Sequence, residues 1–346
     1  MPGRFLLIQT AFIGDVILAT ALIERIHQRH PDVRIDMLVR RGNESLLTGH
    51  PLLHNLLIWD KKGPGGALAK YQNLWRLAGD IRATRYDVVI NMQRFGATGL
   101  LTALSGAPIT IGFDKNPFSR WFTHRLPHQI RPGLHEVDRN ASLLTPLQND
   151  WGHFGTARHR PRLYPSPADY EAVRPYQAGP YVCVAPTSVW FTKQFPAQGW
   201  VETIRLLPPA RRVYLLGAPA DHAACEAIRA DAVARGHVPE QVVNLSGKLS
   251  LLQSAALMQG AQMNYVNDSA PLHLCSAMNA PTTAVFCSTV PGFGFGPLAD
   301  QSRVVEIREP LECRPCNLHG RPACPLGHFR CAYGIDVNEL RIKSEE

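Results

Sequence analysis

The chain has 346 residues, which is enough for about two domains of ordinary size. Hydrophobic residues make up 45% of it, and this content excludes an intrinsically disordered protein. The 36 Lys and Arg exceed the 28 Asp and Glu, for a net charge of +8. An anionic partner, such as a phosphate compound, a nucleic acid or an anionic membrane face, is therefore favoured over a cationic one.

The first half of the chain predicts a strand-loop-helix-strand series. A short apolar run over residues 5–8 is typical of a buried strand, and a helix is expected from about Asp15 to Arg29. Apolar residues with a period of about 3.6 predict a second helix over 68–81. Further strands are expected over 33–39, 56–59, 87–90 and 109–111. This alternation predicts a parallel sheet.

A second series follows a stretch rich in proline, residues 158–180, which is the expected linker. Strands are expected over 181–185, 213–216, 242–244, 263–266, 282–286 and 303–307, and helices over 198–207, 221–235, 250–260 and 270–278, with a short one after Asp336. The two series predict an α/β protein with two Rossmann-like domains, 1–165 and 178–346, that face a central cleft. Ligands of such sheets bind at the carboxyl ends of the strands.

Targeting signals are not evident in the sequence. No apolar run approaches the roughly 18–20 residues of a membrane-spanning helix, and Asp15 interrupts the apolar stretch near the N-terminus, unlike a signal peptide. We therefore expect a cytoplasmic protein whose eight cysteines are reduced.

The loop after the first predicted strand ends in Gly14 and Asp15. It lacks the G-x-G-x-x-G pattern, so an oxidoreductase that binds a dinucleotide at this turn is disfavoured. Two roles are open for Asp15 at the start of the helix. It could be the N-cap, a position that Asp favours strongly, or a general base at the floor of the cleft.

Two loops of the second series have the residue types of a diphosphate site. Residues 187–193 offer hydroxyls and the cation of Lys193, and residues 267–271 offer small side chains at a helix start, where backbone N–H groups bind anions. Each of these residues also has a structural alternative. Lys193 could be an ordinary solvated lysine, and Asp268 could cap the helix instead of accepting hydrogen bonds from sugar hydroxyls. The chain contains no D-x-D motif, which favours cationic side chains over a divalent ion at the phosphates.

Four of the cysteines crowd into residues 313–331, here called the Cys-rich segment: Cys313, Cys316, Cys324 and Cys331. The C-x2-C half is typical of structural zinc sites, whereas the C-x6-C half is wider than usual. An iron–sulfur cluster has no motif match. Two interpretations stay open, a structural zinc site and a set of reduced thiols in a compact loop.

Taken in order, these loops resemble those of the ADP-heptose:lipopolysaccharide heptosyltransferases, glycosyltransferase family 9. The matching segments span nearly the whole chain: IQTAFIGDVILATALIERI, PTSVWFTKQFPAQGW, LLGAPAD, NLSGKLSL and VNDSAPLHLCSAMNAPTTAVF. The resemblance implies a GT-B fold and an inverting transfer of a sugar from a nucleotide diphosphate. It also implies that catalysis needs neither a metal nor another cofactor.

Position by position, the resemblance implies roles for residues of this chain. Asp15 matches the family's catalytic base, and Asp268, with Gly14, is placed at the donor sugar. The residues implied to bind the donor diphosphate are Thr187, Ser188, Lys193, Ser269 and Ala270. The nucleotide ribose or base is assigned to Asp221 and Gly217. Ala270 replaces a glycine of the family pattern and Leu249 a threonine, so the donor sugar itself stays open.

The expected partners are a nucleotide-diphosphate sugar and an anionic glycolipid acceptor of the lipopolysaccharide core. Candidate acceptor residues are Arg94, Arg120 and Arg125, and a peripheral contact with the inner membrane is expected from the same basic region. The alternatives are a family transferase that uses another nucleotide sugar and a basic, zinc-containing nucleic-acid-binding protein. The nucleic-acid alternative is weaker, because the basic residues are dispersed along the chain.

Overall fold

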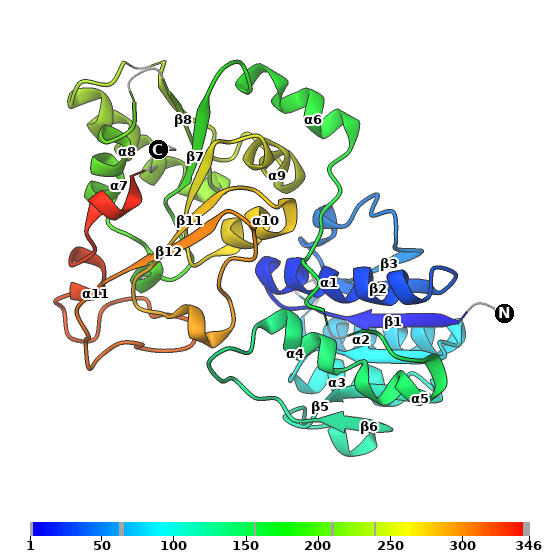
Figure 1. The fold of residues 1–346 in the computed structure, drawn as a ribbon. Coiled ribbons are helices and arrows are strands. Elements are labelled where there is room, and N and C mark those ends of the chain that lie inside the picture. The colour runs from blue at the N-terminus through cyan, green and yellow to red at the C-terminus, as the bar shows by residue number, and fades with distance from the viewer. Residues whose placement is uncertain (1–2, 62–65, 156, 209–210, 239, 342–346) are drawn as a thin grey trace. The chain divides into compact units, whose positions relative to one another are not determined.

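The computed structural model describes residues 3–61, 66–155, 157–208, 211–238 and 240–341 (Figure 1). It divides into two compact units. Unit 1 comprises Met1–Ile130 and Glu136–Tyr164, and unit 2 comprises Arg131–His135 and Pro165–Glu346. The short piece Arg131–His135 thus belongs to unit 2, although unit 1 continues after it in the sequence.

Unit 1 is built on a six-stranded parallel sheet with the strand order β3-β2-β1-β4-β5-β6. The strands are β1 (Arg4–Ile8), β2 (Arg34–Arg40), β3 (Asn55–Trp59), β4 (Val88–Asn91), β5 (Ile109–Phe113) and β6 (His124–Leu126). The helices are α1 (Ile13–Arg29), α2 (Gly66–Thr84), α3 (Gly96–Leu104), α4 (Glu136–Ser142) and α5 (Gln148–Trp151). The apolar runs of β1 and β4 are buried, as expected for a parallel sheet covered on both faces.

Unit 2 repeats this topology, with the order β12-β11-β10-β7-β8-β9. Its strands are β7 (Tyr181–Ala185), β8 (Arg212–Leu215), β9 (Val242–Asn244), β10 (Met263–Asn267), β11 (Thr282–Phe286) and β12 (Ser302–Glu306). Its helices are α6 (Pro167–Val173), α7 (Ala197–Arg205), α8 (His222–Ala234), α9 (Leu251–Gln259), α10 (Ala270–Met278) and α11 (Arg330–Tyr333). Both sheets have the Rossmann order, which confirms the predicted α/β class.

Short 3₁₀ helices lie between these elements: Glu44–Leu46, Ser119–Trp121, Thr145–Leu147, Arg174–Tyr176, Phe191–Lys193, Pro219–Asp221, Pro291–Phe293 and Val337–Leu340. The predicted linker 158–180 was wrong in one respect, because it contains α6. Ser166 starts this helix: its Oγ accepts a hydrogen bond from the backbone N of Asp169.

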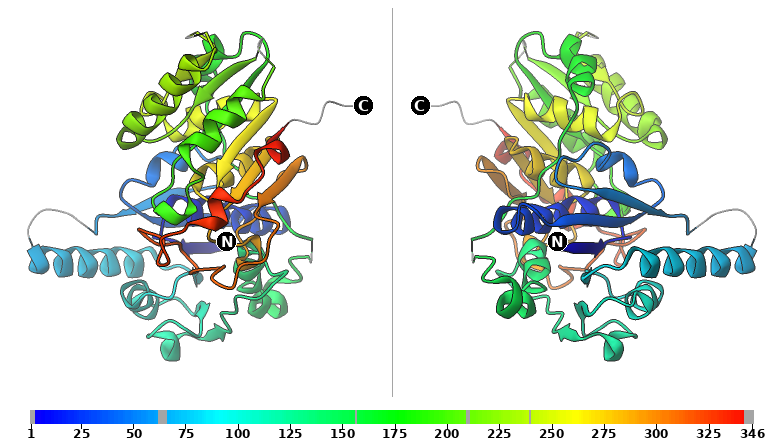
Figure 2. Two further views of the ribbon diagram at one scale, coloured as in Figure 1. Left: turned by 90° about the vertical axis from the view of Figure 1, so that its left-hand side faces the viewer. Right: turned by 90° about the vertical axis from the view of Figure 1, so that its right-hand side faces the viewer.

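Helix α2 departs from its predicted packing. Its buried face consists of Leu74, Leu77, Ala78 and Ile81, within one apolar cluster of unit 1. Tyr71 and Trp75, which the period also assigned to the apolar face, are 64% and 58% exposed. Figure 2 shows the N-terminal turns of α2 extending beyond the rest of unit 1. The apolar stripe of this helix is therefore wider than the core that it covers.

No helix within the described residues is both long and apolar enough to cross a membrane.

Candidate functional site

The candidate site of unit 2 lies where the strand order of its sheet reverses. Strands β7 and β10 are neighbours there, and their connections leave on opposite sides, the arrangement that opens a ligand crevice in Rossmann sheets. The loop after β7 carries Lys193, and Asp268 directly follows β10. Lys193 Nζ lies 2.7 Å from Asp268 Oδ2, and both side chains are largely buried. The structure thus brings together two residues that the sequence predicted for one site.

Asn267, the last residue of β10, connects the same two loops. Its Oδ1 accepts a hydrogen bond from the backbone N of Phe195 at 2.9 Å, and its Nδ2 donates to the carbonyl of Pro186 at 2.8 Å. Gln194 adds a bond from its Nε2 to the carbonyl of Ser188 at 2.7 Å. These bonds hold the loop with Thr187 and Ser188, both half-buried, beside the end of β10.

Helix α10 begins at this edge of the sheet. Ser269 is its N-cap and Ala270 its first residue, so the backbone N–H of Ala270 has no partner within the helix, whereas that of Leu272 donates to the carbonyl of Ser269. Pro271 follows in the same turn, where its fixed φ suits a helix start. The predicted diphosphate residues therefore flank a helix N-terminus, an environment that favours negative charge.

Asp221 lies at the next loop of the sheet, after β8. Its Oδ2 accepts a hydrogen bond from the backbone N of Ala218 at 2.7 Å. A Cβ on Gly217 would lie 2.8 Å from Asp221 Cβ, so this turn can close only with glycine there. One carboxylate oxygen of Asp221 is thus engaged in shaping the turn.

Asp15 lies in the first turn of α1, in unit 1, with Gly14 before it. It is not the N-cap; it is the third helical residue, and its Oδ2 accepts a hydrogen bond from the backbone N of Phe12, the N-cap, at 3.1 Å. Burial, and to a smaller extent the negative charge of Glu136, raises the pKa of Asp15 to about 6. Glu136 is itself paired with Arg139 at 2.6 Å. A carboxylate with a pKa near 6 can accept a proton close to neutral pH.

The predicted acceptor arginines, Arg94, Arg120 and Arg125, are all exposed on unit 1. The guanidinium of Arg120 stacks over the ring of Trp121, with its Cζ 3.9 Å from the ring centroid. Trp121 is itself half exposed.

Sequence reasoning missed Thr289, which follows β11. Its Oγ1 donates to Asp268 Oδ2 at 2.7 Å, so this oxygen receives both Thr289 and Lys193. Strand β11 pairs with β10, and residues that follow neighbouring parallel strands end at the same edge. The predicted strand over 282–286 could therefore have pointed to Thr289.

The Cys-rich segment does not support the predicted zinc site. Across the described residues, no group of three or more His, Cys, Asp or Glu could hold a metal ion. Cys331 is buried in the apolar core of unit 2, and Cys316 Sγ donates to the carbonyl of Cys313 at 3.2 Å. Burial, and to a smaller extent the neighbouring cysteine thiols, raises the pKa of Cys331 to about 11 and also raises that of Cys316.

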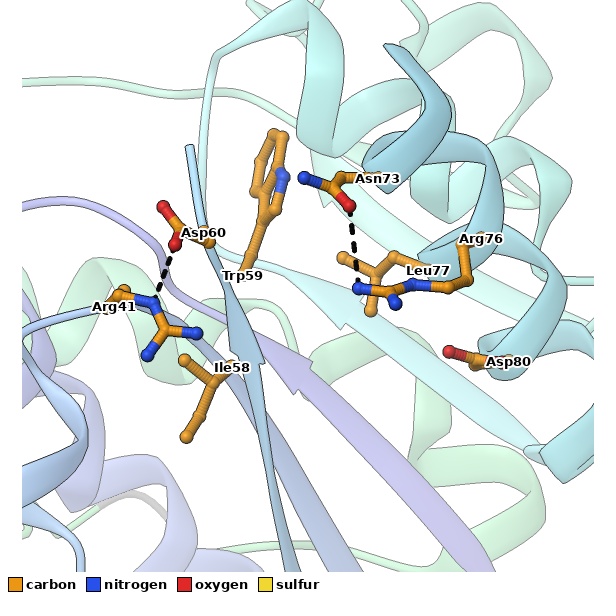
Figure 3. A pocket seen from close by; sticks show the side chains of 8 residues that line it. All are labelled: Arg41, Ile58, Trp59, Asp60, Asn73, Arg76, Leu77 and Asp80. Carbon is orange, nitrogen blue, oxygen red and sulfur yellow. Dashed lines mark hydrogen bonds and ion pairs between the residues drawn. The ribbon is translucent and has the colours of Figure 1, made fainter. Parts of the chain in front are cut away.

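A surface cavity of about 200 Å³ lies in unit 1 between α2 and the edge strand β3 (Figure 3). Arg41 pairs with Asp60 at one side of it, and Arg76 reaches Asn73 at the other. None of the predicted site residues lines it. Its volume is below the roughly 300–1,000 Å³ of usual small-molecule pockets.

Sequence comparisons relate the chain to a known family. Residues 74–323 match the model of glycosyltransferase family 9 (heptosyltransferase). Lipopolysaccharide heptosyltransferase 3 of Escherichia coli is 29% identical over 290 residues, which cover 80% of this chain and 82% of that protein.

Solved structures share the fold across both units. A family 9 glycosyl transferase from Veillonella parvula superposes with a TM-score of 0.80 at 19% identity, covering 98% of this chain and 95% of that one. The E. coli heptosyltransferase WaaC with ADP has a TM-score of 0.70 at 22% identity, covering 87% of this chain and 92% of that one. These likenesses confirm the predicted GT-B fold.

Proposed function

The chain belongs to glycosyltransferase family 9, the heptosyltransferases, and from this premise we propose that it transfers a heptose from an ADP-linked donor to an acceptor of the lipopolysaccharide core. The observation that carries the proposal is the Lys193–Asp268 pair at the reversal point of the unit 2 sheet. Relatives named as lipopolysaccharide heptosyltransferases, and a solved relative with bound ADP, support the donor and the acceptor class.

In this proposal the donor diphosphate binds at Lys193 and at the first turn of α10. The leaving diphosphate gains negative charge as the bond to the sugar breaks. Lys193 and the backbone N–H groups of Ser269 and Ala270 stabilise this charge because they are oriented before the reaction. Thr187 and Ser188 add hydroxyls from the neighbouring loop. Asp268 accepts hydrogen bonds from the donor sugar.

Asp15 is the general base in this proposal. The acceptor hydroxyl loses its proton while its oxygen attacks the anomeric carbon, and Asp15 takes that proton. Gly14 leaves room for the donor sugar beside it, and Asp221, with Gly217, binds the nucleotide ribose or base. The reaction inverts the anomeric centre, because the attacking oxygen enters opposite the departing diphosphate.

A donor screen tests the function directly. The full chain is incubated with ADP-heptose or with UDP-, GDP- and dTDP-sugars in the presence of a lipid A-core acceptor, and nucleotide release is measured with and without EDTA. We expect release from ADP-heptose alone, unchanged by EDTA. Equal or faster turnover of another nucleotide sugar would assign the chain a different donor, and loss of turnover in EDTA would refute metal-independent transfer.

We propose that the acceptor binds to unit 1, which accounts for the whole net charge of the chain. Unit 1 holds 20 Lys and Arg against 12 Asp and Glu, a net of +8, whereas unit 2 holds 16 of each. Arg94, Arg120 and Arg125 then bind the anionic groups of a glycolipid acceptor. We place the enzyme on the cytoplasmic face of the inner membrane, in peripheral contact with it.

The exposed aromatics of α2 make this membrane contact testable. Tyr and Trp are the side chains that prefer the membrane–water interface, and Tyr71 and Trp75 lie one helical turn apart. We expect Tyr71→Ala/Trp75→Ala to lower the partition into phosphatidylglycerol-containing vesicles about tenfold, measured by co-sedimentation. Tyr333→Ala, at an equally exposed tyrosine of unit 2, is the control. Equal partition of the double variant and the control would exclude α2 as the contact.

A further inference from the structure

We propose that the Cys-rich segment positions both members of the Lys193–Asp268 pair through backbone and arginine contacts. The inference rests on the proposed function, because it assigns the segment to the donor phosphate site. Two separate sets of hydrogen bonds and one close backbone approach support the positioning role.

The first set of bonds lies behind Lys193, at its neighbour Thr192. The backbone N of Thr192 donates to the carbonyl of Arg321 at 3.1 Å, and its Oγ1 accepts from the backbone N of Arg321 at 2.8 Å. Ser288 adds its hydroxyl, which lies 2.9 Å from Thr192 Oγ1, and the backbone N of Cys316 donates to the carbonyl of Ser288. Thr192 is almost completely buried, so its orientation depends on these partners.

The second set lies behind Asp268, at its partner Thr289. Arg314 Nη2 donates to the carbonyl of Thr289 at 2.8 Å, and Arg314 Nε donates to the carbonyl of Cys287 at 2.7 Å. The same guanidinium is paired with Glu306 on β12. Arg314 thus fixes the chain that follows β11, and from there Thr289 reaches Asp268.

The close approach is made by Gly320. It has a φ of +82°, and a Cβ there would lie 2.8 Å from Lys193 Cγ and 3.0 Å from Trp190 Cβ. The absence of a side chain at Gly320 therefore lets the Cys-rich segment lie directly against the stem of Lys193. The ring of Phe329 adds a further contact, 5.1 Å from that of Phe191.

Together these contacts join the Cys-rich segment to both loops that carry the pair. The segment contacts the lysine loop through Arg321, Gly320 and Phe329, and it contacts the aspartate loop through Arg314. Lys193 and Asp268 lie 2.7 Å apart although they come from different loops, and this segment contacts both loops.

The test compares two glycines of the same segment. Gly320→Ala and Gly327→Ala both place an alanine at positive φ, +82° and +72°, so both carry a similar backbone strain. At Gly327 no atom lies within 4 Å of the added Cβ, whereas at Gly320 the added Cβ meets Lys193. We expect Gly320→Ala to weaken ADP binding about tenfold or more by titration calorimetry, and Gly327→Ala to change it less than about twofold. Equal effects of the two would overturn the proposal.

A double variant identifies the route of the effect. Lys193→Ala removes the Cγ that the new side chain would meet, so Gly320→Ala should weaken ADP binding far less in that background. Full additivity of the two changes would show that Gly320 acts elsewhere. If Gly320→Ala fails to fold, two variants of Thr192 provide the test instead. Thr192→Ser keeps the hydroxyl and Thr192→Val loses it, so only Thr192→Val should weaken ADP binding. Equal ADP binding by the two variants would overturn the proposal.

The same measurements separate this inference from the proposed function. If the unaltered chain does not bind ADP, or if Lys193→Ala binds it as well as the unaltered chain, the proposed donor site is wrong. If Lys193→Ala weakens binding while Gly320→Ala and Thr192→Val do not, only the positioning role of the Cys-rich segment is wrong.

Discussion

Asp15→Asn is expected to lower kcat about 1,000-fold while ADP affinity changes less than about twofold. Asparagine keeps the size of the side chain and the oxygen that accepts from Phe12, but it cannot take a proton. The loss should therefore fall on the chemical step and not on donor binding. Asp32→Asn, at an exposed aspartate of unit 1, is the matched control. Near-normal turnover by Asp15→Asn would remove Asp15 from the role of base.

The pH dependence of turnover follows from the pKa of Asp15. With a pKa of about 6, the base is ionised above pH 6 and becomes protonated below it. We expect kcat/KM to fall about tenfold for each pH unit below 6, and to level off above pH 7. A profile that stays flat down to pH 5 would contradict a base with this pKa.

The same pKa makes a prediction about stability. The pKa of Asp15 is raised in the fold, from 3.8 to about 6, so the fold disfavours its charged form. The resulting loss of stability is absent below pH 3.8, grows as pH rises to 6 and is complete above it. Asp15→Asn should therefore raise the free energy of unfolding at pH 8 by on the order of 2 kcal/mol, and not at pH 3.5, as measured by urea denaturation.

Lys193→Ala is expected to lower kcat/KM about 100- to 1,000-fold, because it removes a fixed positive charge from the departing diphosphate. The variant also leaves the buried carboxylate of Asp268 without its cation, although Thr289 still donates to it. We therefore expect a loss of stability of about 1–3 kcal/mol in addition.

Two controls separate the effect of Lys193 on catalysis from that on stability. Arg229→Ala removes one positive charge from unit 2 at a half-exposed ion pair with Glu226, so it should leave kcat/KM within about twofold. Lys193→Ala/Asp268→Asn removes the unpaired charge and should recover part of the lost stability but none of the activity. Recovery of activity in the double variant would indicate that Lys193 serves only to neutralise Asp268.

Comparison of the sequence with the structure shows where local patterns succeed. Strands such as 181–185 and 282–286 were predicted at the bounds that the structure has, because continuous apolar runs between loops are a local property of buried parallel strands. Helix α4 was missed because its sequence, EVDRNAS, has no apolar period. Glu136 and Arg139 are nevertheless buried in it, as an ion pair. A pattern of single residues does not reveal such a pair.

By itself the sequence determined the two βα series, the loops that carry Asp15, Lys193 and Asp268, and the family that these loops resemble. Only the tertiary structure decided which side chains touch. The order of the strands puts β7 beside β10, so Lys193 meets Asp268, and α4 puts Glu136 near enough to Asp15 to raise its pKa. It also brings the Cys-rich segment, through Arg321, against the loop that carries Lys193. The physical reason is that periodicity reports burial along one element, whereas contacts and electrostatics depend on residues far apart in the chain.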